Sequence, residues 1–319
     1  MRRLRVLYVT DRDDAPFRYR VLGPVRELRA SGALANIVRL DDPTAPGAVA
    51  AYDVVVLFRL AWDASVAQVV AAARAAAVPL VFDIDDLLFD VDAAERLPFR
   101  GMLAPSEWEA RYASLIPRLR RTFDAANAFL GSTQTLVEHA ARLGKPARLH
   151  PNLLPREIER LGRVQGALVR ALRGPPTLGY FSGSDTHDED LASVADALGD
   201  VLDERPDARL LAVGHLALGA RHARLRGRVV VVPYLDPRVF GALYAACHAV
   251  IAPLAHRGPF VDAKSPLKFF EPGALGVPVV ASPARELAAA IRHGETGWLA
   301  DSPAEFRDAL REALDAPRA

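Results

Sequence analysis

Hydrophobic and polar residues alternate along this chain in blocks that predict strands and helices in turn. Short, nearly continuous apolar runs are typical of strands buried on both faces of a parallel sheet. In the first half we predict strands at Leu4–Thr10, Ile37–Leu40, Asp53–Phe58, Leu80–Ile84, Ala128–Gly131 and Ala147–His150. In the second half we predict them at Thr177–Phe181, Ala208–Val213, Val229–Val232, Val250–Pro253 and Pro278–Ala281.

Segments with apolar residues at helical spacing separate these strands. The predicted helices are 18–30, 63–77, 104–126 with a kink or break at Pro117, 133–143, 188–204, 237–247, 264–275, 283–292 and 303–315. Strands that alternate with helices indicate right-handed βαβ units and parallel sheets. The predicted fold class is therefore α/β.

A chain of 319 residues is too long to fold around one ordinary hydrophobic core, so we expect two domains. Pro151 and Pro155 flank Asn152, a composition typical of a crossing between domains. We predict a domain at 1–152, a linker with a connecting helix at 153–176, and a domain at 177–319. Both should be doubly wound, Rossmann-like parallel-sheet domains facing across a cleft. Ligands of such sheets bind beyond the carboxyl ends of the strands.

Composition narrows the class of protein. Hydrophobic residues make up 51% and charged residues 25%, as in globular proteins, and the net charge of +1 gives no field that would recruit nucleic acid. The single cysteine, Cys247, excludes an internal disulfide and a multi-cysteine metal site. The apolar run at the N-terminus ends at Asp11, too early for a signal peptide, and no apolar stretch approaches the ~20 residues of a membrane span. We expect a cytoplasmic protein, and the abundance of Ala and Arg suggests a GC-rich, bacterial genome.

Residues 262–282, DAKSPLKFFEPGALGVPVVAS, read as a loop, a helix, a tight turn and a buried strand. Ser265 is a helix-capping residue type, Pro266 suits the first helical turn, and Gly276 suits the end of a helix. One predicted helical face is apolar and consists of Leu267, Phe270, Ala274 and Leu275.

The start of this predicted helix is suited to an anion. It offers unpaired backbone N–H groups, the positive end of the helix dipole, and Lys264 and Lys268 one turn apart. We therefore predict a diphosphate site there, with Glu271 one turn further on as an acceptor of hydrogen bonds from a ribose. The alternative is an ordinary surface helix in which a Lys268–Glu271 ion pair stabilises the helix by about 0.3 kcal/mol.

Two loops of the second half are further candidates for ligand binding. Residues 182–187 follow a strand and precede a helix, where Gly183 permits close backbone approach, Ser184 is a donor, and His187 is either a donor to the ligand or a solvated helix-start residue. The sequence there is neither a P-loop nor G-x-G-x-x-G. Residues 232–236 end another strand, and the backbone amides near Tyr234 and Leu235 could hold a nucleobase. The alternatives are a capped turn in the first loop and a proline-ended strand in the second.

In the run VFDIDDLLFD, Asp83, Asp85 and Asp86 place three carboxylates at the end of a strand. Asp83 and Asp85 in Asp-x-Asp order resemble the first motif of haloacid-dehalogenase phosphatases, but Leu87 departs from that motif. The structural alternative is that Asp83 and Asp86 cap a turn. We favour a third reading, in which Asp85 or Asp86 acts on an acceptor hydroxyl. Carboxylates this close repel one another, so one of them should have a raised pKa, and no third ligand for Mg²⁺ is evident.

Arginines are the remaining candidates in the first half. Arg18 and Arg20 start its first helix and could meet an anionic ligand or the acceptor, with a solvated face as the alternative. Arg118, Arg120 and Arg121 form a basic cluster that most simply is solvated; a membrane-surface contact is the alternative.

Taken together, these motifs resemble the C-terminal half of retaining glycosyltransferases of the GT-B fold, the family-4 type also termed glycosyl transferases group 1. The most specific strings are KSPLKFFEPGALGVPVVAS and HGETGWLA. Two positions depart from the family pattern. The acid often found eight residues before Glu271 is replaced by Ala263, with Asp262 beside it, and SGSDTHDED lacks the usual Arg and Lys.

The resemblance implies transfer of a sugar from a nucleotide-diphosphate sugar to an acceptor hydroxyl, with retention, within glycan biosynthesis. It implies no cofactor beyond the sugar nucleotide, no metal, and an acceptor that is a glycan, a lipid-linked molecule or a small molecule. Glu271 would bind the donor ribose, and Lys264 and Ser265 the diphosphate beside Gly183. The predicted donor-site residues are Gly183, Ser184, His187, Tyr234, Leu235, Lys264, Ser265, Pro266, Leu267 and Glu271.

The predicted catalytic residues are Asp85, Asp86 and Lys268, with Arg18 and Arg20 on the acceptor side. Helix-end amides and lysines that hold the departing diphosphate more strongly as its charge grows would lower the barrier. Three alternatives stay open: a nucleotide-sugar epimerase on the same fold, a phosphatase using Asp83 and Asp85, and a sugar-nucleotide binder without activity.

Overall fold

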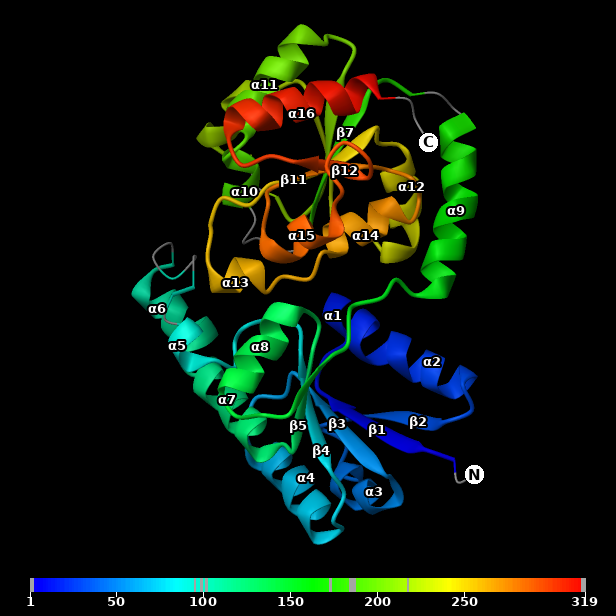
Figure 1. The fold of residues 1–319 in the computed structure, drawn as a ribbon, viewed down its shortest axis with the longest axis vertical. Helices are drawn as coiled ribbons and strands as arrows, with labels where there is room; N and C mark the ends of the chain where they lie inside the picture. Colours follow the sequence, from blue (N-terminus) through cyan, green and yellow to red (C-terminus); the bar gives the residue numbers. More distant parts are fainter. Residues whose placement is uncertain are drawn as a thin grey trace. The chain divides into compact units, whose positions relative to one another are not determined.

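The computed structural model describes residues 3–94, 96–97, 100, 103–171, 174–183, 188–216 and 218–316. It divides into two compact units (Figure 1). Unit 1 comprises Met1–Leu153 and Gly258–Ser265, and unit 2 comprises Leu154–Arg257 and Pro266–Ala319. Each unit contains a six-stranded sheet whose neighbouring strands all pair in parallel, which confirms the predicted α/β class.

The sheet of unit 1 has the strand order β2-β1-β3-β4-β5-β6. Its strands are β1 (Arg5–Thr10), β2 (Leu34–Arg39), β3 (Val54–Phe58), β4 (Leu80–Ile84), β5 (Ala128–Gly131) and β6 (Ala147–Leu149). Its helices are α1 (Ala15–Phe17), η1 (Arg18–Leu22), α2 (Gly23–Ala30), α3 (Ala45–Ala48), η2 (Val49–Ala51), α4 (Ala64–Ala75), α5 (Val91–Ala94), α6 (Pro105–Trp108), η4 (Glu109–Ala113), α7 (Leu115–Ala125), α8 (Gln134–Arg142) and α13 (Pro259–Asp262).

Successive residues of a strand face opposite sides of the sheet. Because most successive residues of the central strands are apolar, both faces of this sheet are apolar. In β1, Val6 and Tyr8 pack with Val21 and Val25 on one face. Residues of the opposite face of the sheet, among them Leu7, Val9, Leu57 and Phe82, pack with apolar side chains of α4, α7 and α8.

The sheet of unit 2 has the strand order β12-β11-β10-β7-β8-β9. Its strands are β7 (Thr177–Ser182), β8 (Arg209–Gly214), β9 (Val229–Val232), β10 (Ala249–Ala252), β11 (Val279–Ala281) and β12 (Gly297–Leu299). Its helices are α9 (Arg156–Ala171), α10 (Asp188–Ala192), α11 (Ala195–Glu204), η6 (Ala220–Leu225), η7 (Pro237–Val239), α12 (Phe240–Ala245), α14 (Leu267–Gly273), α15 (Arg285–Ala290) and α16 (Pro303–Asp315). The strand order reverses between β7 and β10, the point where open α/β sheets bind ligands.

Two pairs of helices in unit 2 pack against each other, α11 with α16 and α9 with α12. Helices α11 and α16 lie side by side, and their apolar residues form a core with Leu178, Tyr180 and Ile251 of the strands (Figure 1). Helix α9 packs on α12 at glycines: a Cβ on Gly241 would lie 2.3 Å from the Cα of Gly162, so the two backbones approach more closely than any larger residue permits.

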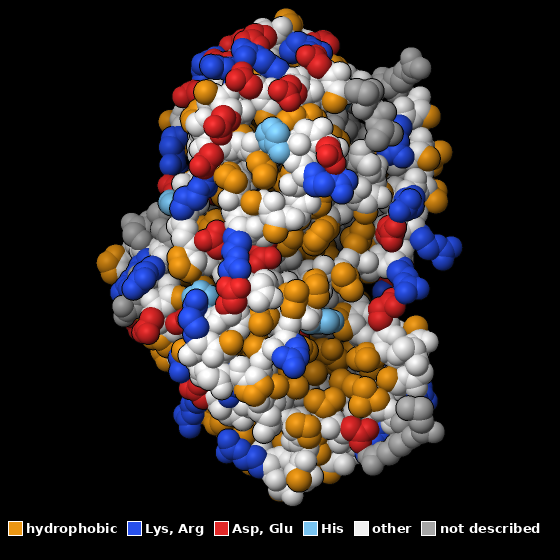
Figure 2. All heavy atoms as spheres, in the orientation of Figure 1, with side chains coloured by type: hydrophobic (Ala, Val, Ile, Leu, Met, Phe, Trp, Pro, Cys, Tyr) orange, Lys and Arg blue, Asp and Glu red, His pale blue; other side chains and the backbone are white. Residues whose placement is uncertain are grey.

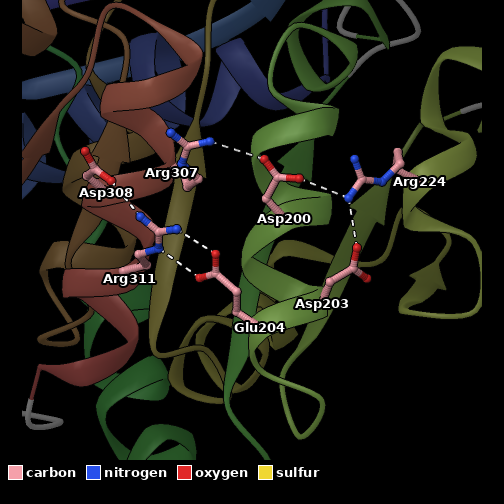
Figure 3. A network of polar contacts seen from close by, with 7 residues as sticks. All are labelled: Asp200, Asp203, Glu204, Arg224, Arg307, Asp308 and Arg311. Carbon is pink, nitrogen blue, oxygen red and sulfur yellow. Dashed lines mark hydrogen bonds and ion pairs between the residues drawn. The ribbon is translucent and has the colours of Figure 1, made fainter.

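Charged side chains cover the outer surface of α11 and α16. Arginines of η6 and α16 bind carboxylates of α11 and α16. The network consists of Asp200, Asp203, Glu204, Arg224, Arg307, Asp308 and Arg311 (Figure 3). Figure 2 shows both signs of charge interspersed over the end of unit 2 where these helices lie. The described residues contain no helix that is both long and apolar enough to cross a bilayer.

The predicted helix 264–275 is wrong at its start. Pro266 precedes the first helical residue, Leu267, with a non-helical ψ of 40°, and no side chain caps the helix there. Ser265 is not the N-cap, and its Oγ is buried without a hydrogen-bond partner among the described residues. Lys264 and Lys268 therefore do not share a helix. Phe270, assigned to the buried face, is 37% exposed.

The predicted helix 18–30 contains a π-helical turn, η1, before α2 begins. Pro24 has no N–H to donate to the carbonyl four residues before it, and the N–H of Gly23 bonds the carbonyl of Arg18, five residues back. The strand β12 was not predicted, and the predicted helix 188–204 is two helices, α10 and α11.

Candidate functional site

The carboxyl ends of β7 and β8 bring two backbones into close contact. Gly214 ends β8 with φ of 110°, and a Cβ there would lie 1.9 Å from the carbonyl oxygen of Ser182. The next amide, that of His215, donates to the same carbonyl at 3.2 Å. Glycine is thus required at Gly214. At the predicted Gly183, an added Cβ would meet nothing within 4 Å, and the predicted Ser184 and His187 lie outside the described residues.

Aromatic rings line this edge of the sheet. His215 and Tyr234 are exposed and stack with their centroids 5.3 Å apart and their planes 18° from parallel. Phe240 lies edge-on to Tyr234 at 5.9 Å, and Leu235 is half-buried. The predicted Tyr234 therefore belongs to a flat, exposed surface that suits stacking of a planar group. His215, which follows β8 directly, was not among the predicted site residues.

The helix α14 presents a carboxylate and a cation from neighbouring turns. The hydroxyl of Tyr244, a buried residue of α12, donates to the carboxylate of Glu271. Lys268 Nζ is enclosed by protein and lies 5.2 Å from the ring centroid of Tyr180, within the range of a cation–π contact. Tyr244 in turn packs against Phe181, with centroids 4.2 Å apart, so a rigid aromatic base supports Glu271.

Unit 1 holds a fully buried ion pair at the carboxyl edge of its own sheet. Arg20 Nε and Nη2 donate to the two oxygens of Asp83 at 2.8 and 2.7 Å, and both side chains are 0% exposed. Arg20 also donates to the carbonyl of His150 and, at 3.4 Å, to Asn152 Oδ1. We predicted that Arg20 contacts the acceptor. This prediction is wrong, because Arg20 is fully buried and bound to Asp83, and its role is structural. Arg18 is half-buried.

This pairing also bears on the phosphatase hypothesis. A nucleophile must reach its substrate, and Asp83 is enclosed with both carboxylate oxygens held by Arg20. The geometry contradicts a nucleophilic role for Asp83. No group of three or more His, Cys, Asp or Glu side chains within the described part of the chain could hold a metal ion.

Asp85 and Asp86 share a single arginine. Arg59 Nη1 donates to Asp85 Oδ1 at 3.0 Å, and Arg59 Nη2 lies 2.6 Å from Asp86 Oδ2. Burial raises the pKa of Asp85 to about 6, against the lowering effect of Arg59, and Asp86 adds to the rise. The predicted direction of the pKa shift is confirmed, but its main cause is burial and not repulsion between the carboxylates. Arg59 was missed, although it is a charged residue that directly follows a wholly apolar strand.

The segment Gly258–Ser265 lies far along the chain but belongs to unit 1. Ala263 is buried in the core of unit 1, and its carbonyl accepts a hydrogen bond from Thr133 Oγ1 at 3.0 Å. Phe260 packs on the same core, and Lys264 Nζ lies 5.6 Å from its ring centroid. The predicted donor residues are thus divided: Lys264 and Ser265 lie in unit 1, whereas Pro266, which is buried, and the half-buried Leu267, Lys268 and Glu271 lie in unit 2.

The second half of the chain matches a known protein family. Residues 175–316, nearly all of unit 2 after α9, match the sequence model of the family described as Glycosyl transferases group 1. This part of the chain is a Glycosyl transferases group 1 domain. The predicted resemblance is confirmed, and with it the predicted enzyme class. A comparison of this glycosyltransferase with curated proteins gave no match.

Solved structures show that the whole glycosyltransferase has the GT-B fold. HepE from Anabaena, in complex with UDP, matches with a TM-score of 0.59 and 16% identity, over 98% of this chain and 90% of that one. WaaG, a glycosyltransferase involved in lipopolysaccharide biosynthesis, matches with 0.63 and 14%, over 98% and 90%. A putative UDP-N-acetylglucosamine 2-epimerase from Listeria monocytogenes matches with 0.56 and 14%, over 99% and 89%. At these identities the likeness concerns the fold alone.

Proposed function

We propose that this glycosyltransferase moves a sugar from a nucleotide-diphosphate sugar to an acceptor hydroxyl, with retention of configuration and without a metal. The observation that carries the proposal is the arrangement on α14, where Tyr244 orients Glu271 and an enclosed Lys268 lies one turn away. Because HepE has been solved with UDP and with UDP-glucose, we further propose a uridine diphosphate sugar as the donor.

The donor-site roles follow from the chemistry of each group. The exposed His215–Tyr234 stack offers a surface for the base. The Glu271 carboxylate can accept hydrogen bonds from a ribose. Lys268 is the cation for the diphosphate, assisted by the loop at Gly183, Ser184 and His187 and by the backbone near Leu235, Pro266 and Leu267.

Catalysis then rests on differential binding. The bond from the anomeric carbon to the diphosphate oxygen breaks, and negative charge grows on the diphosphate. A lysine held inside the protein binds that charge more strongly as it develops, and one such donor contributes ~3 kcal/mol. The acceptor hydroxyl attacks from the side that the diphosphate leaves, and its proton passes to a diphosphate oxygen. Asp85, with Asp86 and Arg18, orients the acceptor hydroxyl.

A donor-binding experiment tests the proposal. Glu271→Ala should weaken UDP binding and sugar transfer about tenfold or more, since a charged hydrogen-bond partner is lost. Isothermal titration calorimetry with UDP and with UDP-sugars measures the binding. Glu295→Ala, at an exposed carboxylate paired with Arg292, is the matched control and should bind UDP normally.

Two further arms test the finer points. Product analysis without an acceptor separates transfer from epimerisation, since an epimerase converts the sugar nucleotide alone. Activity that EDTA abolishes and Mg²⁺ restores would contradict the metal-independent mechanism. Unchanged UDP affinity and turnover in Glu271→Ala would contradict the donor site itself.

A further inference from the structure

Arg59 lies where two neighbouring strands of unit 1 end together. Strand β3 pairs with β4 in a register that sets Phe58 opposite Asp83, and the Arg59 amide donates to the Asp83 carbonyl at 2.8 Å. Arg59 is the first residue after β3, and Asp85 is the first after β4. The sheet itself therefore brings the Arg59 side chain to the carboxylates that follow β4.

The backbone of Arg59 is left-handed, with φ of 51°. Few residues other than glycine adopt this conformation, because Cβ crowds the following carbonyl. Glycine would suit the turn better, so arginine at this position indicates a task for the side chain.

The guanidinium divides its two ends between two carboxylates. Nη1 binds Asp85 and Nη2 binds Asp86, and the three side chains are 15%, 13% and 29% exposed in the order Arg59, Asp85, Asp86. A planar guanidinium presents its donors at a fixed angle, so it sets the separation and orientation of both carboxylates.

Other charges face the same cluster from neighbouring elements. Arg20 of η1 acts on Asp85, and Asp14, the N-cap of α1, acts on Arg59. Arg20 is already bound to Asp83, and Asp14 is bound by Arg12. Of these arginines, Arg59 is the one that directly bonds Asp85.

We propose that Arg59 is a positioning residue of the acceptor site, which holds Asp85 in the orientation and charge state that receive the acceptor hydroxyl. This inference rests on the proposed function. It predicts two separate effects of removing the guanidinium: the Asp85 carboxylate loses its fixed orientation, and it loses the nearest positive charge. The second effect raises the pKa of Asp85 further above its ordinary value, because burial is then less opposed.

The test is the pH profile of kcat/KM for sugar transfer. In the native enzyme we expect a loss of activity as the pH falls through the region near 6, where Asp85 takes up a proton. In Arg59→Gln this acid limb should move to higher pH, and activity at pH values near the native limb should fall about tenfold for each unit that the pKa rises. Arg59→Lys keeps a positive charge without the planar fork, so it should retain more of the native acid limb but with a lowered kcat.

Arg5→Gln is the matched control. It removes another arginine–aspartate contact of the same sheet, Arg5 with Asp53 at 2.9 Å, from the amino ends of β1 and β3. Its pH profile should equal that of the native enzyme. UDP binding, measured by calorimetry, should stay unchanged in all three variants, since no donor-site residue is altered.

The outcomes are separable. Native pH profiles and native kcat in both Arg59 variants would overturn the inference while leaving the glycosyltransferase function intact. A native enzyme with no transfer activity would instead refute the proposed function. Should Arg59→Gln fail to fold by circular dichroism, Arg59→Lys decides alone: an unchanged kcat overturns the positioning role, and a lowered kcat with unchanged UDP affinity supports it.

Discussion

Two groups of ion pairs, one in each unit, lie in different surroundings and differ in what they do there. In unit 1, Arg20–Asp83 and Arg59–Asp85–Asp86 lie at the carboxyl edge of the sheet, enclosed or nearly so. In unit 2, the arginine–carboxylate network lies on outer helices in solvent (Figure 3). The same interaction is costly to break where water is excluded and contributes little where water competes.

The two sheet edges carry correspondingly different side chains. The edge of unit 1 is lined by paired charges, whereas that of unit 2 is lined by aromatic rings around Lys268 and Glu271. Paired charges suit the control of a carboxylate, as proposed for the acceptor. Rings and one enclosed cation suit a ligand that brings a flat base and its own negative charge.

The largest effect is expected from Asp83→Ala in unit 1. Removing one partner leaves Arg20 charged and buried, and this should lower the free energy of unfolding by about 3–5 kcal/mol. Urea denaturation measures the loss. Asp53→Ala, at the partly exposed pair with Arg5, is the control and should cost much less. Equal losses in the two variants would mean that burial does not distinguish these pairs.

A smaller effect is expected from Tyr244→Phe in unit 2. The ring should keep its packing against Phe181, so the fold should persist, but Glu271 loses the hydroxyl that orients it. Affinity for UDP should fall about tenfold, the usual worth of a hydrogen bond to a charged group. Tyr52→Phe, which removes a hydroxyl bonded to Asn36 in unit 1, should bind UDP normally. A normal affinity in Tyr244→Phe would show that Glu271 does not depend on this contact.

The smallest effect is expected from Glu204→Gln on the surface of α11. Its hydrogen bond from Arg311 holds the pKa of Glu204 below the ordinary 4.5, so the pair stabilises the fold above that pH and loses its effect as the pH falls through the lowered pKa. The Tm should drop slightly at neutral pH, and the difference from native should vanish in acid and in high salt. A large drop that persists in high salt would contradict the contrast between buried and exposed pairs.

Local pattern was sufficient for most strands. Runs such as Val54–Phe58 and Ala249–Ala252 are apolar because both faces of a parallel strand are covered, and this needs no knowledge of neighbours. β12, Gly297–Leu299, escaped prediction because it is short and begins with glycine, a residue that is depleted in strands. The start of α14 was misplaced because capping residue types preceded Pro266, while the chain before the proline packs on unit 1 instead.

The candidate site was less accessible to sequence reasoning. Glu271 and Lys268 lie on one short helix, so their spacing alone brings them close. Arg20 and Asp83 are far apart along the chain, and so are Arg59 and Asp85. Their pairing depends on the order β1-β3-β4 in the sheet, which the hydrophobic pattern does not specify.

The passage of Gly258–Ser265 into unit 1 has a consequence for dividing the protein. A fragment that begins after Leu153 would carry Phe260, Val261 and Ala263 without the core that covers them. The complementary fragment would leave Thr133 without the Ala263 carbonyl and would bare the apolar surface beneath α13. A single cut at the linker therefore yields two incomplete pieces, each with an exposed patch prone to aggregation.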